Sequence, residues 1–206
     1  PGAWVHTHNL GMSAADRSAE TGADRLRAPV SSAAPTWSGY RRADGRWGTR
    51  NTVAILTSVN CSATVARRIA DAFPPASLLK GVDDVVAYTH IGGCGGAPDG
   101  EDVRLLQRTL AGYARHPNVA AVLVVGLGCE ANQISDWLSH EGLQPGPALR
   151  TLSIQEAGGT LKAIEAGKAM VSELIVLAAA ARRETAPASG LVVGLQCGGS
   201  DGWSGV

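Results

Sequence analysis

The sequence has few aromatic residues and no excess of charge of either sign. Phe, Trp and Tyr make up 4% of the 206 residues, and 18 Lys and Arg residues balance 18 Asp and Glu residues. Without net charge, the chain has no long-range attraction for nucleic acid or for an anionic membrane surface. With so few aromatic rings, it also lacks the stacking platforms that hold single-stranded nucleic acid. We therefore expect neither nucleic acid nor a membrane as a partner.

The sequence also lacks an 18-residue apolar run, a signal peptide and any Cys-x-x-Cys motif. These absences predict a cytoplasmic protein whose thiols stay reduced. Successive cysteines are separated by 33, 35 and 68 residues, too far apart for the clustered ligands of a zinc or iron–sulfur motif. Any metal ion would have to be gathered across loops. The four cysteines are Cys61, Cys94, Cys129 and Cys197.

The ends of the chain suggest a piece of a longer polypeptide, because it begins at Pro1 and stops in a glycine-rich segment. Residues 1–10 are typical of a short strand and its exit. Residues 11–38 are rich in Ala, Ser, Asp, Arg and Pro without a hydrophobic period, as in a linker. We expect one α/β domain over residues 39–206, truncated at its C-terminal end.

Within that domain, apolar strand-like runs alternate with amphipathic helical stretches. The pattern predicts an α/β fold with a mainly parallel, open, Rossmann-like sheet of about five strands and helices on both faces. The predicted strands are 52–59, 85–90, 119–127, 150–154 and 191–196, and the predicted helices are 62–73, 100–115, 130–140 and 160–183.

Glycines and cysteines concentrate where the predicted strands end. All four cysteines follow a strand, at the edge of the sheet where ligands bind in such folds. Each thiol alone could be a small buried hydrophobe, and the glycines could serve only tight turns. Alternatively, the glycine loops present backbone N–H groups to an anion such as a carboxylate. The loop residues that we predict to bind substrate are Asn60, Gly93, Gly95, Gly128, Gln133, Gly198, Gly199, Ser200 and Asp201.

Histidines and arginines provide further candidates. His90 stands at a strand end, as either a ligand, an acid/base residue or a structural hydrogen bonder. His6 and His8 are two residues apart on an extended segment and could share a metal ion, or could simply be solvated. Arg46, Arg50 and Asn51 precede the first long strand. Arginine forks there could clamp a carboxylate, or pack the loop through ordinary charge pairs.

Several of these segments resemble, in order along the chain, the altronate/galactarate dehydratase family of sugar-acid hydro-lyases. The matching segments are Gly39–Arg46 with Gly48–Asn51, Val59–Thr64, Thr89-His90 with Gly93–Gly95, Gln107–Leu110, His116–Asn118, Gly126–Glu130 with Asn132-Gln133, and Gly194–Asp201. Val5–Leu10 resembles the end of the small β domain with which larger members begin. Those members also continue into a second catalytic portion.

The resemblance implies dehydration of a hexonate or hexarate, altronate- or galactarate-like, to a 2-keto-3-deoxy acid with a divalent metal, typically Fe²⁺. A base would remove the proton α to the carboxylate, positive groups would stabilise the enediolate, and an acid would assist loss of hydroxide. The whole protein is expected to form a homo-oligomer, and this piece alone could be inactive. The candidate catalytic residues are His90, Cys94 and Glu130, and the candidate metal ligands are His6, His8, Cys129 and Cys197.

Three other functions remain open. A sister branch of the family is similar to sulfolactate sulfo-lyases, which eliminate sulfite instead of water. The chain could also be a non-catalytic anion-binding or assembly module, with glycine loops that merely hold a ligand. An iron–sulfur protein is disfavoured by the dispersed cysteines, although a visible absorption band would restore it.

Overall fold

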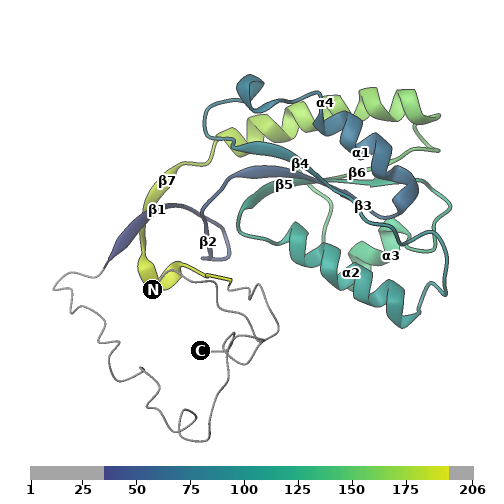
Figure 1. Ribbon diagram of the computed structural model, residues 1–206, viewed down its shortest axis with the longest axis horizontal. Coiled ribbons are helices and arrows are strands. Elements are labelled where there is room, and N and C mark those ends of the chain that lie inside the picture. The colour runs from purple at the N-terminus through teal and green to yellow at the C-terminus, as the bar shows by residue number, and fades with distance from the viewer. Residues whose placement is uncertain (1–34, 195–206) are drawn as a thin grey trace, which may run out of the picture. The chain divides into compact units, whose positions relative to one another are not determined.

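The computed structural model describes residues 35–194, and its helices and strands all lie in one unit formed by residues 36–190 (Figure 1). The predicted β-domain tail and most of the predicted linker fall outside the described residues. So do seven of the predicted site residues, which therefore have no place in the geometry below. They are His6, His8, Cys197, Gly198, Gly199, Ser200 and Asp201.

Four parallel strands form the central sheet, in the order β4-β3-β5-β6. Their bounds are Thr52–Thr57 for β3, Asp84–Tyr88 for β4, Val119–Gly126 for β5 and Leu149–Ser153 for β6. Val53 of β3 lies opposite Val85 of β4 and Ala121 of β5, which sets the register of the centre. The predicted α/β class with a mainly parallel sheet is confirmed, with four strands in that sheet.

Helices cover both faces of the sheet (Figure 1). Helices α1 (Ala63–Ala70) and α4 (Thr160–Ala179) pack on one face, and α2 (Glu101–Ala114) and α3 (Ile134–His140) pack on the other. The chain moves from β3 to β4 in one direction and then returns past β3 to β5. Because parallel crossovers are right-handed, that reversal places α1 and α2 on opposite faces.

Apolar and polar residues do not alternate along strand β3, because both of its faces are buried. Val53 and Ile55 pack into the core beneath α1 and α4, whereas Ala54 and Leu56 pack into the core against α2 and α3. Both faces of the strand are covered, so every position has to be compatible with burial.

A second, antiparallel sheet contains β2, β1 and β7 in that order. Strand β1 is Thr36–Arg41, β2 is Trp47–Gly48 and β7 is Arg183–Pro187. Strand β1 therefore begins inside the range that was predicted as linker. Residues 191–194, the described part of the fifth predicted strand, are not in a strand, so that prediction was wrong there. Four of the five β7 residues are exposed, and β7 consequently lacks the apolar pattern that identifies buried strands.

Short 3₁₀ turns at Asn60–Ser62, Pro75–Ser77 and Ala188–Gly190 complete the secondary structure. Among the described residues, none of the helices combines the length and the apolar character needed to span a bilayer.

Candidate active site

The loops that follow β3, β4 and β5 meet at one end of the parallel sheet, which we call the carboxyl edge. The chain reverses its direction across the sheet between β3 and β5, and such a switch point opens the crevice where α/β folds bind ligands. Backbone hydrogen bonds join the three loops. The Asn60 amide donates to the Gly92 carbonyl at 2.9 Å, and the Asn132 amide donates to the Gly93 carbonyl at 3.2 Å.

Glu130 is a buried carboxylate beneath these loops, with only 4% of its surface exposed. The Ser58 hydroxyl donates to its Oε1 at 2.6 Å, and the Leu127 and Gly128 amides donate at 3.1 and 2.5 Å. Burial alone would raise the pKa of Glu130, but the Ser58 hydroxyl and the backbone N–H groups outweigh it, so the pKa is lowered. A carboxylate held in this way is a poor proton acceptor and a strong anchor between β3 and the loop after β5.

A buried chain of amides extends this anchor into the helices. Asn132 donates to the Ser58 carbonyl at 2.9 Å and accepts from the Gln107 amide at 3.1 Å. The backbone carbonyl of Gln107 accepts from the Trp137 indole at 3.0 Å. Ser58, Gln107 and Asn132 were not among the predicted site residues. Gln107 occupies the buried stripe of α2 with Val103 and Leu110, and a polar residue at an apolar stripe position was the available signal.

His90 follows β4 and has both ring nitrogens in contact with the backbone. Its Nε2 lies 2.8 Å from the Thr57 carbonyl, and its Nδ1 accepts from the Gly92 amide at 3.1 Å. One neutral tautomer, with the proton on Nε2, satisfies both contacts. In this structure, His90 thus connects β3 to the loop that carries Cys94.

Three thiols from three different loops gather at the carboxyl edge. Cys61, Cys94 and Cys129 are free and exposed. Desolvation by neighbouring atoms, a hydrogen bond with the Cys94 thiol and the nearby charges of Cys94 and Cys129 raise the pKa of Cys61. The three cysteines that the structure describes thus all follow strands and lie at the same edge of the sheet, and we call them the thiol cluster.

Two glycines allow the loops to approach so closely. Gly93 has φ +90° and packs against the Ser58 carbonyl, where a β-carbon would overlap the backbone. Gly128 has φ +124°, and a β-carbon there would lie 2.5 Å from Gln155 Oε1. Both glycines are therefore required by the backbone. Gly95, by contrast, has open space around it.

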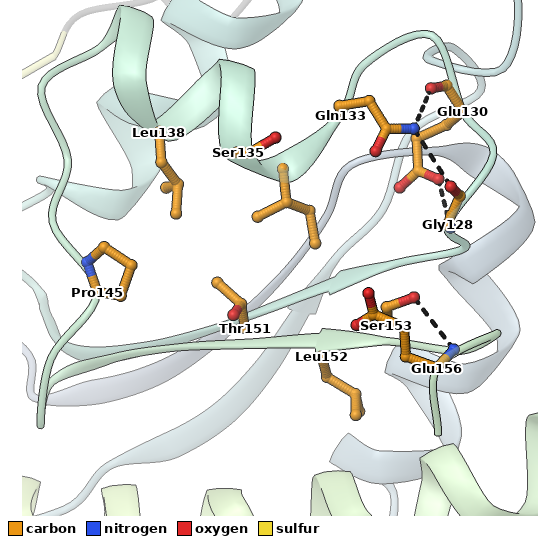
Figure 2. Close-up of a pocket in the computed structure, with 11 residues that line it drawn as sticks. Gly128, Glu130, Gln133, Ser135, Leu138, Pro145, Thr151, Leu152, Ser153 and Glu156 are labelled. Carbon is orange, nitrogen blue, oxygen red and sulfur yellow. Dashed lines mark hydrogen bonds between the residues drawn. The ribbon is translucent and has the colours of Figure 1, made fainter. Parts of the chain in front are cut away.

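A cavity of about 350 Å³ lies between the loop after β5, α3 and β6 (Figure 2). Gly128, Glu130 and Gln133 line one end, and the Gln133 amide holds the loop by donating to the Glu130 carbonyl at 2.6 Å. Hydroxyl groups from α3 and β6, the carboxylate of Glu156 and four apolar residues line the rest. The apolar residues are Ile134, Leu138, Pro145 and Leu152. No lysine or arginine is present among the described residues of this lining. The cavity suits hydroxyl groups of a ligand better than an unneutralised carboxylate.

The predicted arginine clamp lies at the other end of the sheet, which we call the amino edge. Residues 50 and 51 precede β3, whereas Ser58 follows it, and the six residues of β3 span roughly 20 Å. Arg46 pairs with Asp44 at 2.7 Å. Asn51 is fully buried, donating to the Gly81 and Ala178 carbonyls at 2.7 and 2.9 Å. The structure therefore does not bring these residues together with the cysteine and glycine loops.

Comparison with known proteins matches residues 39–179 to the second domain of the D-galactarate dehydratase/altronate hydrolase family. The chain belongs to this family. It is 33% identical over 207 residues to altronate dehydratase of Bacillus subtilis (strain 168), covering 100% of this chain and 41% of that protein. Galactarate dehydratase (L-threo-forming) of Escherichia coli (strain K12) is 36% identical over 187 residues, 83% of this chain and 34% of that protein.

The beta subunit of (2R)-sulfolactate sulfo-lyase from Chromohalobacter salexigens is 31% identical over 173 residues, 82% of this chain and 40% of that subunit. The chain thus spans less than half the length of these relatives. All the loops of the carboxyl edge described above lie within the matched range of the dehydratase family. The family resemblance inferred from the sequence is confirmed.

The described part of the chain does not by itself supply a metal site. Among residues 35–194, no group of three or more His, Cys, Asp or Glu side chains could hold a metal ion. Cys129 is the one predicted ligand that is described, and it stands in the thiol cluster. The donor set present here therefore does not fit a complete Fe²⁺ centre.

Proposed function

We propose that this chain is the second domain of a hydro-lyase that dehydrates an altronate- or galactarate-like sugar acid to a 2-keto-3-deoxy acid. The family match over residues 39–179 carries the proposal. The position of the matched loops supports it, because those after β3, β4 and β5 converge on the switch point of the sheet.

The reaction needs a base for the proton α to the carboxylate, a means to stabilise the enediolate, and an acid for the departing hydroxide. His90 and Glu130 take positioning roles in this proposal, because hydrogen bonds occupy their polar atoms. Cys94 is the exposed candidate for contact with substrate. The cavity beside Gly128 would accept the hydroxylated part of the sugar acid.

Dependence on Fe²⁺ stays part of the proposal, but we assign no step to the metal. The described residues do not complete its ligand set. The substrate carboxylate would likewise need a neutralising group beyond those that line the cavity.

A domain exchange tests the proposal. We would replace the aligned segment of the Bacillus subtilis altronate dehydratase with this chain and assay altronate and galactarate, with and without added Fe²⁺, for 2-keto-3-deoxy acid. We expect turnover of one of the two acids. A matched chimera carrying Ser58→Ala should keep its fold and lose activity by about tenfold or more, because Ser58 anchors the loop through Glu130. A folded chimera that dehydrates neither acid would contradict the proposal.

The sulfo-lyase relative supports a second candidate, elimination of sulfite from a sulfonated hydroxy acid. The same chimera would then release sulfite from sulfolactate. Sulfite release without any 2-keto-3-deoxy acid would replace the first proposal with the second.

A further inference from the structure

The proposed dehydration does not explain why three exposed thiols stand together at the carboxyl edge. Cys61, Cys94 and Cys129 come from the loops after β3, β4 and β5, and each is free. Exposed thiols gathered on separate loops are available to small solutes, unlike structural cysteines that pack as buried hydrophobes.

Backbone contacts bring two of these cysteines into adjoining loops. Strands β3 and β4 are neighbours in the sheet, so the loops that follow them start side by side. The Asn60 amide donates to the Gly92 carbonyl at 2.9 Å, and this bond ties the loops together. Cys61 directly follows Asn60, and Cys94 lies two residues beyond Gly92.

Close packing reinforces that bond. Gly93 lies against the Ser58 carbonyl with no room for a side chain, and its own carbonyl accepts from the Asn132 amide at 3.2 Å. The segment just before Cys94 is thus held from two sides. The separation between the two loops is set by backbone, so it does not depend on the rotamer of either cysteine.

The contacts of the Cys61 thiol distinguish between its two neighbours. Desolvation is the largest influence that raises its pKa, and a hydrogen bond with the Cys94 thiol comes next. Cys129 influences the Cys61 thiol through its charge alone. The backbone bond between the first two loops and the influence of Cys94 on Cys61 both favour Cys94 as the partner thiol.

We propose that Cys61 and Cys94 form a redox-active dithiol, which a low-molecular-weight disulfide such as oxidised glutathione converts reversibly to an intramolecular disulfide. One cysteine thiolate attacks a sulfur of oxidised glutathione, breaks its S–S bond and releases one glutathione thiolate. The second cysteine loses its proton and attacks the mixed disulfide, releasing the second glutathione. The two cysteines together lose two electrons and two protons, and one oxidised glutathione becomes two reduced glutathiones.

The test is a redox titration of the whole 206-residue chain. The protein would be equilibrated in buffers with increasing ratios of oxidised to reduced glutathione, its remaining thiols would be alkylated, and its peptides would be mapped by mass spectrometry. We expect a cross-linked peptide containing Cys61 and Cys94, two hydrogens lighter than the reduced pair. It should be about tenfold or more as abundant as any disulfide containing Cys129, because a backbone hydrogen bond holds the Cys61 loop directly against the Cys94 loop.

Matched variants give the control. Cys61→Ser and Cys94→Ser should each abolish the cross-link, whereas Cys129→Ser should keep it. Peptide mapping of the unmodified chain is decisive even if a variant fails to fold. Pairing of Cys61 with Cys129 or Cys197, or glutathione adducts without an internal cross-link, would overturn the proposal. Because no turnover is measured, failure here leaves the proposed dehydration untouched.

Discussion

The two edges of the parallel sheet use their polar residues in opposite ways. At the amino edge, polar side chains bond to one another and to the backbone. Asn51 joins β3 to the carbonyls of Gly81 and Ala178, and its Oδ1 accepts from Arg42 at 2.9 Å. Apart from the exposed Arg50 side chain, the side chains of this edge that we predicted to bind substrate have their hydrogen bonds already used.

At the carboxyl edge, the saturated groups lie underneath and the unsaturated ones lie outside. Ser58, Glu130 and Asn132 form a buried layer that fixes three loops, and exposed thiols stand on those loops. The contrast shows that polar residues near a strand indicate a ligand site only when their hydrogen bonds are not already used. Arg46 and Asn51 precede β3, but their hydrogen bonds are already used within the fold.

The largest effect is expected from Asn51→Ala at the amino edge. The change removes three hydrogen bonds from a fully buried position, two to the Gly81 and Ala178 carbonyls and one from Arg42, so we expect the free energy of unfolding to fall by about 3 kcal/mol. Urea denaturation measures it. Arg50→Ala is the control, since the exposed Arg50 side chain makes no hydrogen bond in the described structure, and its effect should stay within about 0.5 kcal/mol. Equal losses in the two variants would remove the distinction between saturated and free groups at this edge.

The second effect concerns Glu130 at the carboxyl edge. Glu130→Gln places an amide against N–H donors and should destabilise the domain by about 2 kcal/mol near neutral pH. Glu156→Gln, an exposed carboxylate on the same cavity, should change little. If the two changes cost the same, the buried layer would not be the anchor of this edge.

The pH dependence of stability sharpens the same test. The folded pKa of Glu130 lies below its unfolded value. The stabilisation of the folded domain by the ionised Glu130 carboxylate is therefore complete above the unfolded pKa of about 4.3. It is lost as the pH falls through the folded pKa. Denaturation measured from neutral pH downwards should show this loss in the original chain and a smaller one in Glu130→Gln.

The smallest change in stability is expected from alanine substitutions at two glycines of the carboxyl edge. Gly128→Ala forces a side chain into a positive φ and against Gln155, and should cost about 1–2 kcal/mol. Gly95→Ala meets open space and should be nearly neutral. Thermal unfolding of both variants would show whether glycine is required at Gly128 in particular or is tolerated equally throughout these loops.

Most of the central fold could be predicted because burial leaves a pattern along the chain. The apolar run over Thr52–Thr57 and the stripe of Val103 and Leu110 each indicated their element. Helix α3 begins at Ile134, later than predicted, because Glu130 and Gln133 are used by the preceding loop. Strand β7 escaped prediction since its partner β1 lies about 150 residues away and its side chains are mostly exposed.

The sequence by itself determined the alternation of strands and helices, the family, and the placement of cysteines and glycines at strand ends. These follow from local periodicity and from motifs, which need no knowledge of distant contacts. Only the tertiary structure decided which polar groups are already satisfied: Asn51 by two carbonyls, His90 by the backbone, and Glu130 by Ser58 across the switch point. Hydrogen-bond partners far apart in the chain are set by how the strands are ordered, and that order gathers the thiols at one edge and leaves the arginines at the other.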